Sequence, residues 1–348
     1  MLKVLLIGPL PPPLGGATVL FSQLVTELKS RQQVTLGVIS TARSSPTALS
    51  SAFQFIKVLK QTLTQISQFD VVGFHASKKG ALLFAPFIYG ICKLTGKPWL
   101  FRGFGGYFHK WFQSLSRPSR WLITHTLLQA DAILLETQAS VSFFQTLNLN
   151  LPVHWYANSR TWQATDSAPS RLCASKFIFL GHVSRLKGIP ELIKASLQVE
   201  SVSIDVYGPL QDDFTEDQFY GNIHYKGILQ PEQVAAKLQE YDALILPSKL
   251  PTEGYPGAII EAFLAGIPVI ASAIGAIPEI VDASSGLLIP PGDSAALAAA
   301  INQLQGDSHF YNQLKQGSTA KAGLFCSSRW TDEYLRLSNL VIAQRRVP

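Results

Sequence analysis

With 348 residues, 47% of them hydrophobic, the chain is too long for one ordinary hydrophobic core, and we expect two domains. Its net charge of +6 is unevenly divided, because residues 1–160 carry 15 Lys and Arg against 4 Asp and Glu, whereas residues 161–348 carry 14 against 19. The basic first half favours an anionic partner such as a membrane surface or a lipid phosphate, while the lack of a nucleic-acid motif, or of a basic cluster with interleaved aromatic residues, argues against nucleic acid.

The chain starts MLKVLLIGPLPPP, which is not typical of a signal peptide, because its apolar run is only about five residues long and prolines follow it. The cysteines, Cys92, Cys173 and Cys326, are far apart and form no C-x-x-C pair, which favours a reducing compartment and no metal cluster. We therefore expect a cytoplasmic protein. The most apolar stretch, residues 81–92, is too short to span a bilayer as a helix, and it is either a buried helix or one at a membrane interface.

Short apolar runs alternate with helical patterns, which is typical of parallel α/β sheets. The polar residues 159–176 interrupt the alternation, and we interpret them as a linker. The pattern predicts two doubly wound, Rossmann-like domains, 1–158 and 177–325, that face each other across a cleft, followed by a helical tail at 326–348. The predicted strands are 3–8, 33–39, 70–76, 98–103, 132–137, 153–158, 177–181, 203–208, 223–227, 243–248, 268–272 and 286–291.

In the first domain, the glycine-rich stretch after the first strand is not a G-x-G-x-x-G motif. Prolines interrupt it, and no acidic residue follows at a strand end about 20 residues later, so we reject NAD binding. Gly15 and Gly16 instead begin a helix whose N-terminus can face the predicted cleft. A simple loop is the alternative.

Two cations follow the first strand of the second domain. Arg185 and Lys187 lie between a strand that ends at Gly181 and a helix that begins near Ile189, at the edge where such folds bind ligands. Together they could neutralise a diphosphate without a metal, although a solvated loop would look the same. The acidic stretch 211–214 is not a D-x-D metal clamp, and we expect it to lie away from these cations.

The segment TEGYPGAIIEAF places Glu253 in a loop and Glu261 on the second turn of the following helix. Gly254 and Gly257 allow a ligand to approach the backbone, and the helix N-terminus offers unpaired N–H groups and partial positive charge. We expect a phosphate site made of main chain, with the carboxylates accepting hydrogen bonds from sugar hydroxyls on either side. Helix capping beside a solvated acid is the alternative.

In this order the segments resemble the retaining glycosyltransferases of family 4 (group 1), which have the two-domain GT-B fold. The resemblance is most specific over residues 247–293, with its E-x(7)-E pair, and FLGHVSRLKG and VYGPL resemble two further landmarks. It is looser in the first half, through residues 15–28, 69–77 and 157–160. Trp330 and Tyr334 resemble the family's closing helix, which crosses back to the first domain.

The resemblance implies a nucleotide-diphosphate sugar as donor, bound mainly by the second domain, and a glycan or lipid-linked acceptor. It further implies a role in cell-surface polysaccharide biosynthesis and requires neither a metal nor another cofactor. Arg185 and Lys187 would hold the diphosphate, Glu261 the ribose hydroxyls, and Glu253 would face the transferred sugar. Backbone would contact sugar and phosphate at Gly254, Tyr255, Pro256 and Gly257, and would border the base at Gly227 and Ile228.

The sequence departs from the family pattern in two places. His182 occupies the first basic position of the motif around Lys187, and Arg102 stands where the family often has a histidine. His75 aligns with a different family histidine. We predict that His75 and Arg102 contact the sugar or the acceptor, with a purely structural role as the alternative for each.

Three other functions fit the same sequence. The chain could be a sugar-nucleotide epimerase of the same architecture, or a non-catalytic subunit that binds a sugar nucleotide. It could also be a basic membrane-surface adaptor without a donor site. Under the transferase hypothesis, the basic first half predicts peripheral binding to the anionic inner face of the cytoplasmic membrane.

Overall fold

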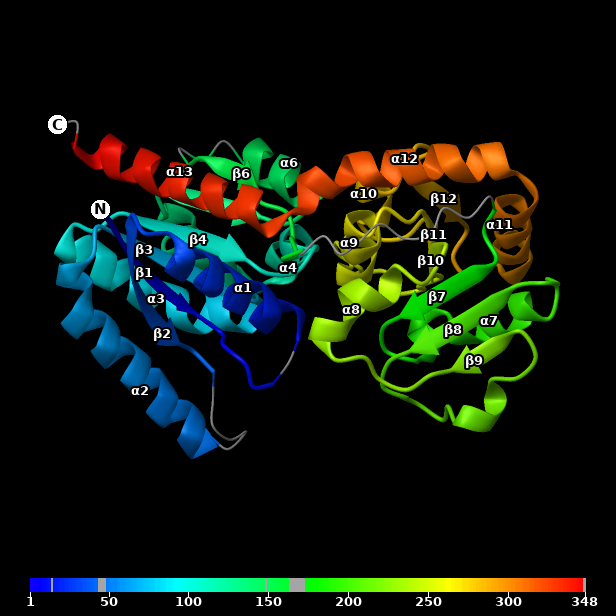
Figure 1. Cartoon of the computed structure of the whole chain (residues 1–348). Helices are drawn as coiled ribbons and strands as arrows, with labels where there is room; N and C mark the ends of the chain where they lie inside the picture. The colour runs from blue at the N-terminus through cyan, green and yellow to red at the C-terminus, as the bar shows by residue number, and fades with distance from the viewer. Residues whose placement is uncertain (14, 43–47, 148, 150, 163–172, 347–348) are drawn as a thin grey trace. The chain divides into compact units, whose positions relative to one another are not determined.

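The computed structural model describes residues 1–13, 15–42, 48–147, 149, 151–162 and 173–346 (Figure 1). The chain divides into two compact units. The first unit combines Met1–Asn158 with Ser327–Pro348, and the second unit is Ser159–Cys326. Much of the predicted linker, residues 163–172, lies outside the described residues.

The first unit contains a six-stranded, fully parallel sheet in the order β2-β1-β3-β4-β5-β6. These strands form because their apolar runs are covered by helices on both faces; all six residues of β3, for example, are buried. The bounds are β1 Leu2–Gly8, β2 Val34–Ser40, β3 Val71–Ala76, β4 Trp99–Gly103, β5 Ala132–Leu135 and β6 Val153–Trp155.

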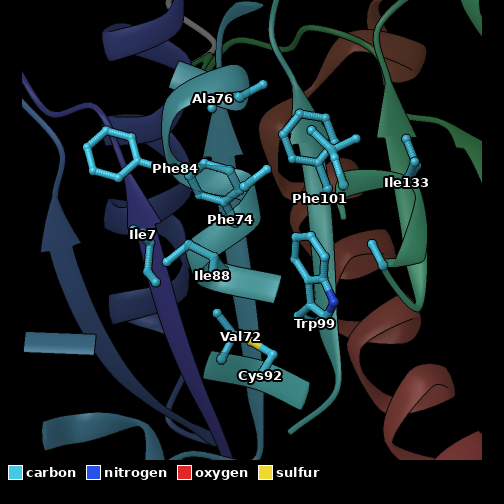
Figure 2. Packing of buried hydrophobic residues seen from close by; sticks show 14 of the residues in the cluster. Ile7, Val72, Phe74, Ala76, Phe84, Ile88, Cys92, Trp99, Phe101 and Ile133 are labelled. Atoms are coloured by element: carbon cyan, nitrogen blue, oxygen red, sulfur yellow. The ribbon is translucent and has the colours of Figure 1, made fainter. Parts of the chain in front are cut away.

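Helices cover this sheet on two sides. The side chains of Val72, Phe74 and Phe101 point to the face covered by α3, where they meet Phe84 and Ile88 (Figure 2). The opposite face is covered by α1 and α13, which also pack on each other. The helices of this unit are α1 Gly16–Ser30, α2 Ala48–Gln65, α3 Lys78–Thr95, α4 Phe108–Ser114, α5 Arg117–Thr124, α6 Gln138–Thr146 and α13 Ser327–Arg346.

The second unit repeats the design with a parallel sheet in the order β12-β11-β10-β7-β8-β9. The prediction of two doubly wound sheets is therefore confirmed, and every predicted strand is present with ends that differ by at most three residues. The strands are β7 Lys176–Leu180, β8 Ser203–Tyr207, β9 Ile223–Tyr225, β10 Ala243–Leu246, β11 Val269–Ser272 and β12 Gly286–Ile289. The helices are α7 Ile189–Ser196, α8 Pro231–Leu238, α9 Gly257–Leu264, α10 Ile277–Ile280, α11 Ser294–Gly306 and α12 Ser308–Phe325.

The last helix, α13, is anchored on the first sheet by an aromatic and basic cluster. The Tyr334 hydroxyl lies 3.3 Å from Nε2 of His75, and the Arg102 guanidinium stacks 4.4 Å from the centre of the Tyr156 ring. The Tyr156 hydroxyl donates to the Trp330 carbonyl oxygen. The sheet makes room for Tyr334 at Gly73, where a Cβ would lie 1.8 Å from the tyrosine oxygen.

Burial changes the protonation of this cluster. The pKa of His75 lies well below its ordinary value, first because the ring is removed from water and then because Arg102 is close. Burial also lowers the pKa of Arg102 and raises that of Tyr156 to about 12. His75 is therefore neutral in the folded protein, with Arg102 as its cationic neighbour.

Gly73→Ala should lower the free energy of unfolding by about 1–3 kcal/mol, because the new methyl group would overlap the Tyr334 hydroxyl and a Leu6 methyl. Urea denaturation of the full chain measures this effect. Gly90→Ala in the middle of α3 is the matched control, since open space surrounds that position and alanine favours a helix by up to about 1 kcal/mol. Equal stability of the two variants would contradict the packing argument.

The buried His75 also predicts a pH dependence. Its pKa is lower in the folded protein than in the unfolded chain, where it is about 6.5, so the unfolded chain takes up the proton more readily. The contribution of His75 to stability is complete above that pH and declines as the pH falls below it, by up to about 1.4 kcal/mol per pH unit. Urea midpoints measured from pH 8 to pH 5 should fall less steeply for His75→Leu than for the parent. Parallel curves for the two proteins would show that His75 does not contribute to the pH dependence of stability.

Candidate functional site

The candidate site lies at the carboxyl edge of the second sheet, where β7 and β10 are neighbours. Because parallel strands end at the same edge, the loops that follow them meet there. Gly188 brings these loops into contact: its φ is +79°, and a Cβ would lie 1.9 Å from the Pro247 carbonyl oxygen. The segment with Lys187 is thus packed directly on the segment that leads to Glu253.

Lys187 and Glu253 form an ion pair across this contact. The lysine Nζ lies 2.8 Å from Oε1 and 2.7 Å from Oε2 of Glu253, and the Ser248 hydroxyl donates to the same Oε2 at 2.7 Å. Glu253 is 8% exposed. The structure therefore brings together the predicted diphosphate cation and the acid predicted to face the sugar, and holds both in a partly buried pair.

Two hydrogen bonds hold the loop from Gly254 to Pro256 in place. The Tyr255 side chain is buried and its hydroxyl donates to Oε2 of Glu279 at 2.7 Å, while the Glu253 carbonyl accepts from the amide of Ala276. Pro256 precedes α9 as its N-cap and supplies no side-chain cap. The predicted site of main-chain contact is therefore a loop held by hydrogen bonds that ends at a helix N-terminus without a side-chain cap.

Arg160 is a site residue that sequence reasoning missed. Its Nε donates to Oε1 of Glu261 at 2.8 Å, and both side chains are mostly buried. A Cβ on Gly257 would lie 1.9 Å from Nη2 of Arg160, so the guanidinium lies against the first residue of α9. Residues 157–160, which include Arg160, contribute to the family resemblance, but the sequence does not indicate that Glu261, 101 residues later, is the partner of Arg160.

Arg185 behaves differently from Lys187. Its exposed guanidinium pairs with Asp213 at 2.7 Å, and its amide donates to Asp212 at 2.9 Å. The hydrogen bonds from Arg185 lower the pKa of Asp213. The expectation that residues 211–214 lie away from the predicted cations is therefore wrong: β8 is the neighbour of β7, so the loop that follows β8 lies beside the loop that carries Arg185.

The remaining predicted donor residues lie in both units. Gly227 follows β9, has φ +82°, and accepts a hydrogen bond from Gly208 at 2.8 Å, while Ile228 beside it is largely exposed. In the first unit, Gly15 is the exposed N-cap of α1, and neither it nor Gly16 has an atom within 4 Å of an added Cβ. The border to a base and the ligand contact at α1 remain predictions.

His75 and Arg102 lie at the carboxyl ends of β3 and β4 as register partners. The His75 side chain is fully buried and Arg102 is 4% exposed, both in the cluster beneath α13. Within the described part of the chain, Nδ1 of His75 and Nη2 of Arg102 have no hydrogen-bond partner. Their packing accounts for the alternative structural role, and their contact with a sugar or acceptor stays a prediction.

The comparisons with known proteins find similarity to glycosyltransferases. Residues 174–307 match the family described as "Glycosyl transferases group 1". The chain is 30% identical over 149 residues to a "Putative colanic acid biosynthesis glycosyltransferase WcaL" of Salmonella typhimurium, and 26% identical over 176 residues to "O-antigen chain mannosyltransferase C" of Escherichia coli. The alignments cover 38% and 49% of this chain but only 37% and 47% of those relatives.

A solved structure extends the likeness to the whole chain. The crystal structure of Anabaena Alr3699/HepE in complex with UDP matches 97% of this chain and 99% of its own, with a TM-score of 0.71 and 17% identity. At that identity the match establishes the fold and nothing more. Residues 174–307 thus match the group 1 glycosyltransferase family, and the chain has the two-domain GT-B fold.

Proposed function

We propose that the protein is a retaining glycosyltransferase that moves a sugar from a nucleotide-diphosphate sugar to a glycan or lipid-linked acceptor during cell-surface polysaccharide biosynthesis. The observation that carries this proposal is the Lys187–Glu253 ion pair in the loops that lead to α9, with Glu261 on the second turn of that helix. Relatives named for colanic acid and O-antigen synthesis support the pathway class.

The chemistry follows from charge. The bond between the anomeric carbon and the diphosphate oxygen breaks, a bond to the acceptor oxygen forms, and the acceptor proton leaves with the diphosphate. Negative charge therefore grows on the diphosphate. Lys187 and the partial positive charge of the α9 N-terminus would stabilise it. Glu253, held by Ser248, would accept hydrogen bonds from the sugar hydroxyls and orient the ring.

Lys187 and Arg185 should contribute unequally. Both cations are paired with an acid, but Lys187 is partly buried, where a charge interaction is strong, whereas Arg185 is largely exposed and screened by solvent. His75 and Arg102 enter the proposal as residues near the acceptor side, and no metal is assigned to the diphosphate. Retention and metal independence rest on the family resemblance.

Lys187→Met should lower kcat/KM by about 10²- to 10³-fold, because the developing diphosphate charge loses its principal side-chain cation. Arg185→Gln should cost less than about tenfold. The assay measures release of UDP or GDP from a panel of nucleotide sugars, with lipid-linked acceptors, with and without EDTA. Lys249→Met is the matched control, because it removes a comparably exposed ion pair, with Glu191, and should leave turnover unchanged.

Other outcomes identify the alternatives. Free isomerised nucleotide sugar without acceptor consumption would identify an epimerase. Donor binding without turnover on any acceptor would identify a non-catalytic subunit. No thermal shift with UDP, GDP or their sugars would remove the donor site altogether, and loss of activity in EDTA would overturn metal independence.

We further propose that the first unit binds an anionic membrane surface through the outer side of α2, α3 and α5. These helices pack side by side on one face of the first sheet, and within the described residues no helix is both long and apolar enough to cross a bilayer. Six of their outward side chains are large and apolar, with between 47% and 69% exposure. This docking face consists of Phe53, Ile56 and Leu63 on α2, Leu83 and Phe87 on α3, and Trp121 on α5.

The charge around the docking face selects the partner. Between Glu27 and Asp131 the sequence contains 13 Lys and Arg but a single acidic residue, Asp70. Exposed cations flank the apolar residues, including Lys57 and Lys60 on α2 and Lys93 on α3. Apolar side chains surrounded by cations match the boundary between acyl chains and anionic headgroups. The helix over residues 81–92 is thus buried on one side, and its other side joins the docking face.

The doubly substituted Phe53→Ser/Phe87→Ser variant should bind phosphatidylglycerol vesicles at least about tenfold more weakly than the parent, because two apolar anchors are lost. Co-sedimentation measures this, and raising the salt from 0.1 to 0.5 M should weaken parent binding. Leu197→Ser/Tyr220→Ser, at exposed apolar positions of the second unit, is the matched control. Equal binding to neutral phosphatidylcholine, or a parent that dimerises through this face, would refute the assignment.

A further inference from the structure

The side chain of Arg160 lies where its positive charge is electrostatically unfavourable. Its guanidinium lies against Gly257, the first residue of α9, where the helix dipole is positive and a cation is disfavoured. Glu261, one turn further along the same face of α9, supplies the compensation by accepting from Nε at 2.8 Å. The arginine therefore spans the first turn of the helix and is fixed at its far end by the acid.

Two further hydrogen bonds, one from the backbone and one from the side chain, hold Arg160 in place. Its amide donates to the Phe325 carbonyl oxygen at 3.0 Å at the end of α12, and its Nη1 donates to the carbonyl oxygen of Ser159 at 3.0 Å. The absence of a side chain at Gly257 makes room for the guanidinium, since a Cβ there would overlap it. The position of the guanidinium is thus set from three sides, independently of a ligand.

This arrangement uses only half of the Glu261 carboxylate. Oε1 accepts from Arg160, whereas the described residues offer no hydrogen-bond donor to Oε2. A free glutamate side chain would sample several rotamers, and an ion pair at a fixed guanidinium restricts it to few. One oxygen of Glu261 is therefore held by Arg160, and the other is left without a donor among the described residues.

We infer that Arg160 is a positioning residue for donor recognition: it holds Glu261 so that Oε2 accepts hydrogen bonds from the ribose hydroxyls of the nucleotide. This inference rests on the proposed function and on the family resemblance, which implies that Glu261 binds the ribose. Binding of the ribose hydroxyls should therefore depend on Arg160, whereas binding of the diphosphate should not.

A direct contact between Arg160 and the diphosphate is the competing arrangement. A cation beside the N-terminus of α9 would attract phosphate, and such a contact would strengthen binding of every diphosphate regardless of its sugar. The two arrangements therefore differ in the affinity of a nucleotide that lacks the ribose hydroxyls. A third arrangement, in which Arg160 only stabilises the fold, predicts no change in affinity at all.

The experiment measures binding of UDP and GDP, and of their 2′,3′-dideoxy forms, to the full chain by isothermal titration calorimetry. Arg160→Gln should weaken binding of the hydroxyl-bearing nucleotide by about tenfold and change binding of the dideoxy form by less than about threefold. Arg160→Lys should give an intermediate loss, because it keeps the charge but lacks the guanidinium fork. In the double variant with Glu261→Gln, the two losses should not add.

Lys321→Gln is the matched control, because Lys321 belongs to an ion pair of the same unit, is buried to the same degree and has no assigned role in the site. Its affinities should equal those of the parent. Equal weakening of both nucleotide forms by Arg160→Gln would replace the inference with direct diphosphate contact, and unchanged affinities would overturn it. A parent that binds no nucleotide would instead refute the proposed function, so the two failures are distinguishable.

Discussion

The site depends on the contact between the loops that follow β7 and β10. These strands are hydrogen-bonded neighbours, and a glycine at position 188 lets the two backbones touch, which sets Lys187 against Glu253. Larger side chains at that point would separate the loops, and the partly buried ion pair would lose one of its members. The segment that carries Glu253 leads directly into α9, so the loop contact, the ion pair and the helix N-terminus follow one another within about ten residues of the chain.

Much of the architecture could be predicted from the sequence, for a physical reason. Strands in a parallel sheet are covered on both faces, so they appear as short apolar runs, and the run at 70–76 corresponds to β3, whose six residues are all buried. The E-x(7)-E spacing likewise places Glu253 before α9 and Glu261 within it. Both inferences use information that is local in the chain.

The pairings between side chains could not be predicted. Arg160 and Glu261 are 101 residues apart, and only the folded second unit brings them to the same turn of α9. Arg185 and Asp213 meet because β8 is placed next to β7, a strand order that hydrophobic periodicity does not encode. His75 was recognised as a residue at a strand end, but its cover, Tyr334, lies 259 residues later in the chain. In each case the residue itself could be identified from the sequence, but its partner in the folded structure could not.

The first unit is built from both ends of the polypeptide, and this has a consequence for its synthesis. The sheet face that carries His75 and Gly73 is covered by α13, which is made after the entire second unit. At about 5–20 residues per second, the 190 residues that follow Asn158 take roughly 10–40 s to translate. Throughout that interval the nascent first unit lacks α13, so the sheet face that carries His75 and Gly73 stays uncovered while the second unit is being made. Every residue of the second unit precedes α13 in the chain, so the sequence of that unit is complete before the first unit can close, although the first unit begins to emerge from the ribosome earlier.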